Sequence, residues 1–282
     1  MRLTAIAAVC VLLVSAAWAQ PDSVTLRLRH QAGQTLSYRA SVSGTGSISL
    51  LDEQQPVTLR GRFTRVEHTL SQVGPDTWEV RVTIEDPSLT FRAGEEEQTL
   101  TMRVPPLTQV VDDRGGVSQV RGWDAAQAEP NAPGIGDAVR PLLGLIQDEG
   151  LPERALQPGE KWTAKAKLKM PDGAERELEQ RFEFVGFQDL AGVPCAEIRS
   201  VADIPVQRQL PADAMGLQVS LVGVQHIESA SLFAYQQGML VRQRTDINLD
   251  LKTSTVLSPE TPDAAVPGAI SLRVKVALDL EP

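Results

Sequence analysis

Apolar and polar residues alternate along most of this chain with the period of a β-strand. The alternation is clear at residues 36–43 and clearer still at residues 78–84, where Asp86-Pro87 is read as the end of a strand. Near Thr64 the apolar positions change from odd to even numbers, which predicts a β-bulge or a sharp bend. These segments predict strands that bury one face and expose the other.

A charged hairpin is the most informative pattern in the second half of the chain. Three lysines alternate with apolar residues before Pro171-Asp172-Gly173, and three glutamates alternate after it. A three-residue loop places Lys169 opposite Glu175, Lys167 opposite Glu177 and Lys165 opposite Glu179. The other face then pairs Trp162 with Phe182 and Ala166 with Leu178, whereas a two-residue loop would mix the two faces. Residues 205–216, with prolines near both ends, are read as a loop.

One segment has helical spacing. Its apolar residues fall at i, i+3, i+4 and i+7, and they are Val139, Leu142, Leu143 and Ile146. Asp137 is a candidate N-cap and Gly150 a stop signal, so we expect a short helix over residues 137–147. The helix and the preceding Ala- and Pro-rich linker (residues 123–154 together) separate two β-rich halves, 20–122 and 155–282, of a single domain.

These elements predict an all-β, mostly antiparallel fold. One short helix cannot cover about a dozen one-faced strands, so the sheet is expected to curl into a half-barrel or open barrel with the helix in its mouth. A two-sheet β-sandwich is the alternative. In the curled sheet the candidate ligand-binding residues are the four on the helical stripe together with two aromatic residues on the hairpin: Val139, Leu142, Leu143, Ile146, Trp162 and Phe182.

The N-terminus predicts export. Arg2 precedes an almost purely apolar run, and Ala17-Trp18-Ala19 fits a cleavage site, so residues 1–19 are read as a signal peptide. We expect a periplasmic or extracellular protein that does not span the membrane. Without the signal peptide Cys195 is the lone cysteine, and it is read as a buried structural thiol. The formal net charge of −9 and the lack of basic runs argue against a nucleic-acid partner.

The chain shows no pattern of catalytic or metal-binding residues. His30, His68 and His226 lie far apart, and no phosphate loop, dinucleotide-binding glycine motif or nucleophile elbow occurs. Asp112 and Asp113, just before Gly115, are read as a turn rather than a calcium loop. We therefore assign no catalytic residue, no metal site and no cofactor.

Three short segments recur about 120 residues apart in the same order, which indicates an internal duplication. They are Gly33-Gln34-Thr35-Leu36 with Gly159-Glu160-Lys161-Trp162, Glu79-Val80-Arg81 with Glu197-Ile198-Arg199, and Gly116-Val117 with Gly238-Met239.

A second set of segments resembles a known group of proteins. The set comprises Leu151-Pro152, Gln157-Pro158-Gly159-Glu160-Lys161-Trp162, Gly192-Val193-Pro194-Cys195-Ala196-Glu197-Ile198, and Phe233 with the Gly238 turn. Over residues 151–252 the chain is similar to exported bacterial β-rich proteins of unknown function. Those proteins resemble periplasmic lipoprotein carriers in architecture, so the resemblance implies a half-barrel around an acyl-binding cavity and assigns no functional residue.

The first functional hypothesis is a non-enzymatic envelope protein that binds an apolar ligand or a lipid in the concave sheet. The second is a protein-interaction or structural module with a packed core and no ligand. A hydrolase comes third, and a close cluster of histidine with carboxylates would favour it.

Overall fold

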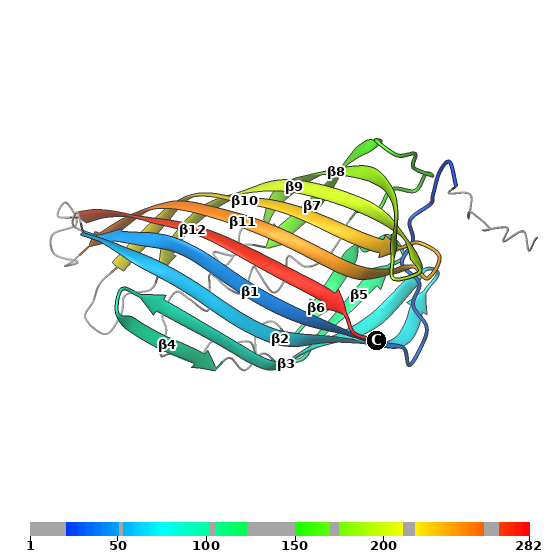
Figure 1. The fold of residues 1–282 in the computed structure, drawn as a ribbon, viewed down its shortest axis with the longest axis horizontal. Coiled ribbons are helices and arrows are strands. Elements are labelled where there is room, and N and C mark those ends of the chain that lie inside the picture. Colours follow the sequence, from blue (N-terminus) through cyan, green and yellow to red (C-terminus); the bar gives the residue numbers. More distant parts are fainter. Residues whose placement is uncertain are drawn as a thin grey trace, which may run out of the picture.

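The fold is a single antiparallel β-sheet. The structure is a computed structural model that describes residues 21–50, 53–101, 105–122, 150–169, 175–210, 218–256 and 265–282. The strands are β1 (Thr35–Leu50), β2 (Glu53–Gly74), β3 (Thr77–Ala93), β4 (Glu96–Thr101), β5 (Leu107–Asp112), β6 (Val117–Arg121), β7 (Lys161–Lys169), β8 (Glu175–Leu190), β9 (Val193–Leu210), β10 (Gln218–Ala234), β11 (Met239–Val256) and β12 (Ala265–Leu280). All twelve belong to the same sheet (Figure 1).

The strand order is β6-β5-β3-β2-β1-β12-β11-β10-β9-β8-β7, and β4 pairs with the part of β3 that β5 leaves free. The last strand, β12, lies between β1 and β11 and so joins the two halves of the chain at the centre of the sheet. The all-β, antiparallel prediction is therefore confirmed. Within the described residues there is no helix, and the helix expected over 137–147 lies outside them.

The sheet is neither closed nor strongly curled, because its end strands β6 and β7 are not paired with each other (Figure 1). The predicted half-barrel or open barrel is therefore wrong. The β-sandwich alternative is wrong for the described strands as well, since they form one layer. Closing a barrel requires the edge strands to pair along their length, and β6 is five residues long whereas β2 has 22.

Local register follows the charge and turn signals of the sequence. The hairpin of β7 and β8 pairs Lys169 with Glu175, Lys165 with Glu179 and Trp162 with Phe182, which confirms the predicted pairing. A register shift between Arg62 and Thr64 confirms the predicted irregularity in β2. The buried residues of β2 nevertheless keep odd numbers beyond it, through Arg65 and Thr69, so the predicted change of face is wrong.

A short N-terminal segment crosses one end of the sheet. We call residues 24–29 the strap. Val24 forms two backbone hydrogen bonds with Leu156, which precedes β7, while the Leu28 amide donates to Asp113 in the β5–β6 turn. The Arg29 amide donates to Gly238 in the β10–β11 turn. The strap thus joins loops at both edges of the sheet to a turn near its middle.

Candidate functional site: the inner face of the sheet

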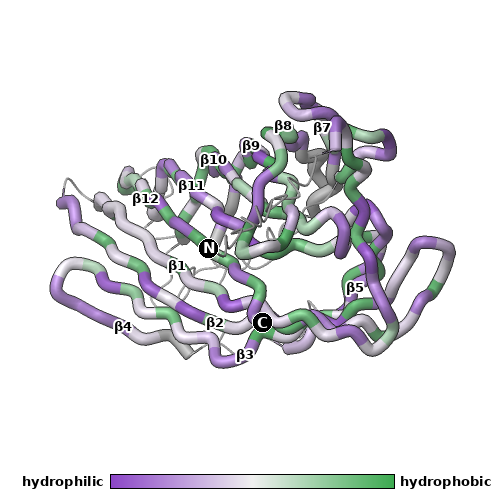
Figure 2. Tube along the Cα trace, turned by 45° about the vertical axis from the view of Figure 1, so that its right-hand side comes forward, coloured by the Kyte–Doolittle hydropathy of each residue, from purple (hydrophilic) through white to green (hydrophobic). Residues whose placement is uncertain are grey.

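One face of the sheet is apolar over most of its width, and we call it the inner face. Figure 2 shows hydrophobic and hydrophilic residues alternating along the strands. Alternation along a strand places every second side chain on the same face, and the register aligns the apolar ones across neighbouring strands. Val42, Val276, Val274, Ile247 and Ile227 lie on this face.

The centre of the inner face carries an apolar cluster built only from strand residues. Its buried members are Leu59, Leu89, Ala202, Ile204, Ile227, Ile247, Val274 and Val276, from β2, β3, β9, β10, β11 and β12. Val42, Phe91 and Leu272 pack against it and are half-buried. No charged residue occupies an inner-face position of β1, of β10 to β12 or of residues 196–206 in β9, as far as these strands are described.

A polar stripe, which the sequence analysis missed, interrupts this apolar face. Ser200, Ser229 and Thr245 lie side by side on β9, β10 and β11, and Ser231 pairs with Gln243 in the adjacent row. Ser229 Oγ and Thr245 Oγ1 are 3.0 Å apart and share a hydrogen bond. The signal was present as Ser, Thr and Gln at every second position of two strands, but only the register shows that they form one row.

Gln180 of β8 extends the polar stripe by one strand. Its Nε2 donates to Ser200 Oγ at 3.0 Å. Four of the six stripe residues are buried, whereas Gln180 and Ser229 are only half-buried. Buried hydroxyl and amide groups are costly unless they are hydrogen-bonded, and the bonds between Ser229 and Thr245 and between Gln180 and Ser200 meet that requirement.

The two predicted aromatic site residues lie together at the strap end of the inner face. The rings of Trp162 and Phe182 stack with centroids 5.1 Å apart and an interplanar angle of 5°. Trp162 Nε1 donates to the carbonyl of Gly150 at 2.9 Å. Leu26 of the strap joins Phe182 in one buried cluster, against which Trp162 packs. The other four predicted residues, Val139, Leu142, Leu143 and Ile146, lie outside the described residues.

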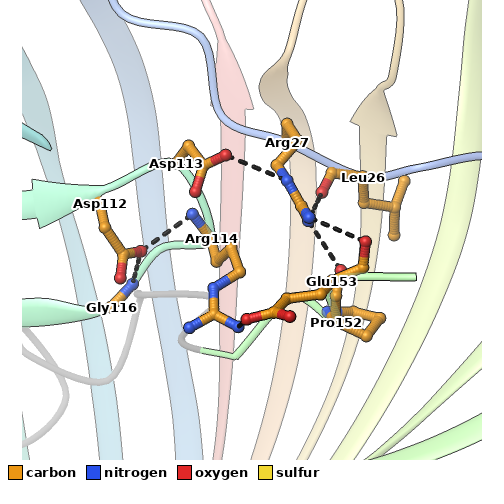
Figure 3. A network of polar contacts seen from close by, with 8 residues as sticks. All are labelled: Leu26, Arg27, Asp112, Asp113, Arg114, Gly116, Pro152 and Glu153. Atoms are coloured by element: carbon orange, nitrogen blue, oxygen red, sulfur yellow. Dashed lines mark hydrogen bonds and ion pairs between the residues drawn. The ribbon is translucent and has the colours of Figure 1, made fainter. Parts of the chain in front are cut away.

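Arg27 holds the strap in place (Figure 3). Its Nε lies 3.0 Å from Asp113 Oδ2, and its two terminal nitrogens donate to the carbonyls of Pro152 at 2.7 Å and Glu153 at 2.9 Å. Close by, Arg114 forms an ion pair with the Glu153 side chain. A planar guanidinium suits this arrangement because its donors are fixed in direction.

Gly238 lets the strap approach the β10–β11 turn. It has a φ of +69°, and a side-chain carbon built there would overlap Arg29 and the carbonyl oxygen of Arg27. This position therefore needs glycine for two reasons: glycine adopts a positive φ without strain, and it has no side chain to overlap the strap. Both the strap and the turn that it crosses depend on this contact.

A histidine with two carboxylates lies on the outer face of the sheet. His226 Nδ1 is 2.6 Å from Asp203 Oδ1, and its Nε2 is 3.1 Å from Glu228 Oε1. Hydrogen bonds to Asp203 first, and then to Glu228, raise the pKa of His226. Both ring nitrogens lie within hydrogen-bond distance of a carboxylate, an arrangement that favours the protonated ring, in which both nitrogens donate. His226, Asp203 and Glu228 thus form a hydrogen-bonded network on the outer face, which becomes an ion-pair network when His226 is protonated.

Cys195 is fully buried, and its thiol donates to the carbonyl of Val193 at 3.3 Å. Burial raises the pKa of this thiol, and the Asp189 carboxylate raises it further. A thiol of raised pKa forms little of the reactive thiolate. The structure thus supports the reading of Cys195 as a packing residue.

The part of the chain that the structure describes shows no group of three or more histidine, cysteine and acidic residues suited to a metal ion. Among the same residues, no helix has the length and apolar character needed to cross a membrane.

Comparison with protein-family models finds no match, and no curated protein matches the chain. Among solved structures, the one titled "Lipid-protein interactions in lipovitellin" is similar with a TM-score of 0.47 and 11% sequence identity. The likeness covers 90% of this chain and 26% of that chain, so this chain spans about a quarter of the lipovitellin chain. At this level it assigns neither a family nor a function. The resemblance to exported bacterial proteins over residues 151–252 stays a prediction.

Proposed function

We propose that this chain is an exported, non-enzymatic binding protein that holds an apolar ligand, such as the acyl chain of a lipid, against the inner face of its sheet. The observation that carries the proposal is the uncharged inner face of the central strands in a one-layer sheet. Apolar surface gains roughly 25 cal/mol for each Å² removed from water, and roughly 0.8 kcal/mol for each CH₂ group. An acyl chain that packs along this face would remove its own apolar surface from water.

The described elements leave room for such a role. The strap and residues 151–156 pack on the cluster around Phe182 and Phe184, and Leu28 of the strap also packs against Val80, Val82 and Val111 on β3 and β5. The central cluster contains strand residues alone. The members of that cluster are buried, whereas Val42, Phe91 and Leu272, which pack against it, are half-buried and leave apolar surface that a ligand could cover.

A second candidate function is a protein-interaction module of the cell envelope. The observation in its favour is on the outer face, where Val222 and Val224 of β10 are 53% and 48% exposed. Two neighbouring valines at this exposure form a small patch that a protein partner could cover. This patch lies on the opposite side of the sheet from the face that we propose for the ligand.

Native mass spectrometry of the protein, purified without detergent from a bacterial periplasm, tests the first proposal. The mass of the chain shows whether it begins at Gln20, and organic extraction identifies whatever is bound. Lipid at near one-to-one occupancy would support the carrier function. A clean protein mass, with no uptake of added oleate or methyl oleate, would refute it and leave the outer face as the site to study.

Two matched variants locate the binding face. Leu249→Gln changes a half-buried inner-face residue of β11, and Val222→Gln changes an exposed outer-face residue on the neighbouring strand. The first is expected to lose bound lipid and the second to keep it, provided that both melt cooperatively. Equal occupancy in the two variants would contradict binding at the inner face.

A further inference from the structure

The polar stripe indicates the chemistry of the ligand. We infer that the inner face binds a neutral acyl ester, with the chain along the central apolar cluster and the ester carbonyl at the polar stripe. This inference rests on the proposed function and narrows it. A face that only bound hydrocarbon would have no use for Ser200, Ser229 and Thr245 in a row at its centre.

The stripe offers hydrogen-bond donors in the right place. A serine or threonine hydroxyl is both a donor and an acceptor, so the Ser229–Thr245 pair can keep its mutual bond and still donate one proton to a carbonyl. Three neighbouring strands span roughly 10 Å at a spacing of about 4.8 Å, which is wide enough for one ester group. Of the three hydroxyl residues in the row, Ser229 is half-buried, whereas Ser200 and Thr245 are buried.

The charge of the site selects against ionised head groups. Beside the polar stripe, at the inner-face positions described for β10, β11 and β12 and for residues 196–206 of β9, there is no lysine or arginine to pair with a carboxylate or phosphate; Arg208 occupies the next inner-face position of β9, opposite Leu221 and eight residues from Ser200. Transfer of an unpaired ionised group into such surroundings is very costly, whereas a neutral ester needs only one or two hydrogen bonds. A free fatty acid or a phospholipid head group therefore fits this site less well than an ester.

The apolar run beside the stripe has the length of an acyl chain. Beyond Thr245 the inner-face residues of β11 as far as Leu251 are apolar, and Val274, Leu272 and Ile270 pair with them on β12. Six residues at about 3.3 Å each give roughly 20 Å. The acyl chains of one membrane leaflet occupy about half of a 30 Å hydrocarbon core, so a long chain fits along this run. The amide of Gln225 on β10 borders the run on one side.

The test compares three probes with similar chains: methyl oleate, oleate and the hydrocarbon 1-heptadecene. Their binding to the purified full protein is measured by native mass spectrometry with added probe and by displacement of a bound fluorescent fatty-acid methyl ester. Methyl oleate is expected to bind most tightly. The variant Ser229→Ala/Thr245→Val keeps the size of the side chains and removes both hydroxyls, and it should bind methyl oleate about 5- to 20-fold more weakly while its affinity for 1-heptadecene is unchanged or higher.

The outcomes separate this inference from the proposed function. If the ester and the hydrocarbon bind equally and the double variant changes neither, the stripe does not recognise an ester, although apolar binding stands. If oleate binds more tightly than methyl oleate, the neutral ligand class is wrong. If none of the probes binds, the proposed function fails and this inference fails with it. Ser220→Ala on the outer face of β10 serves as the control variant and should leave all three affinities unchanged.

Discussion

Replacement of Arg27 by alanine should loosen the strap and destabilise the protein. The guanidinium forms an ion pair with Asp113 and donates to the carbonyls of Pro152 and Glu153 as well as to its neighbour Leu26. A hydrogen bond to a charged group contributes about 1.5–3 kcal/mol, and an exposed ion pair contributes less than about 1 kcal/mol. The Arg27 side chain is 26% exposed, so we expect its contacts to contribute an amount between that of a buried charged hydrogen bond and that of an exposed ion pair.

We therefore expect Arg27→Ala to lower the free energy of unfolding by about 2–3 kcal/mol, since water can replace only some of the lost contacts. For a chain of this size that corresponds to a fall in Tm of roughly 5–10 °C. The matched control is Arg114→Ala, which removes an ion pair whose side chains are 40% and 80% exposed and should cost less than about 1 kcal/mol. Arg27→Lys keeps the positive charge but loses the planar set of N–H donors, so we expect a loss of unfolding free energy between those of the other two variants.

Urea denaturation measures these differences, and hydrogen exchange locates them. The midpoint should fall in Arg27→Ala with the m-value unchanged, and exchange should rise first at the amides of Val24, Leu28 and Leu156, which bond across the strap contacts. If Arg27→Ala costs no more than Arg114→Ala, or if the strap amides exchange as slowly as in the unchanged protein, Arg27 does not hold the strap and the reasoning is wrong.

Three further predictions concern other parts of the sheet. The pKa of His226 is raised in the folded protein, so its contribution to stability is present below about pH 6.5 and is lost as the pH rises through the raised pKa. His226→Gln should remove this pH dependence of the unfolding free energy. The effect should be less than about 1 kcal/mol because the side chain is exposed. A side chain at Gly46 would overlap the carbonyl oxygen of Ser271, so Gly46→Ala should lower the urea midpoint by an amount equivalent to about 1–3 kcal/mol, whereas Ser47→Ala on the outer face should not. Cys195 should react with a thiol reagent such as dithiobisnitrobenzoate only at the rate of unfolding, and a fast reaction in the native protein would contradict its burial.

The sequence predicted strand pairing well where charges and a turn signal agreed. In the β7–β8 hairpin, a slip of one residue would place like charges opposite each other. The register with each lysine opposite a glutamate is therefore the one that the charges favour. The bulge near Thr64 was predicted from the phase of Val66 and Leu70, but the buried side chain there is Arg65, whose charge is paired with Glu67 at 2.7 Å. A buried ion pair of this kind cannot be recognised from hydrophobic periodicity.

Prolines misled the prediction of strand ends. Asp86-Pro87 was read as a stop, yet β3 continues through it, with Asp86 at a φ of +49° where the pairing with β2 shifts register. Proline is tolerated in strands at such irregularities. Residues 205–216 were read as a loop, yet β9 runs on to Leu210 with Pro205 opposite Val224. Long strands of 16 to 22 residues therefore looked like several short ones.

The strand order bears on the predicted duplication, which stays a prediction. The first half follows β6-β5-β3-β2-β1 across the sheet, and the second half follows β11-β10-β9-β8-β7 in the same direction, with β12 between them. The Gly33 amide donates a hydrogen bond to the Thr69 carbonyl of β2, and the Gly159 amide donates one to the Phe184 carbonyl of β8. Each glycine lies just before the first strand of its half. Both glycines have a left-handed φ, of +81° and +86°.

The other two repeated segments occupy matching places. Val80 on β3 and Ile198 on β9 are both buried on the third strand of their halves. Gly116 and Gly238 both precede the last strand of a half, and the strap contacts the turns that contain them. Between the two halves, β12 pairs antiparallel with β1 on one side and with β11 on the other. On this reasoning β12 is what makes two five-strand units into one continuous sheet, and deletion of residues 265–282 should leave a chain that cannot form the central apolar cluster.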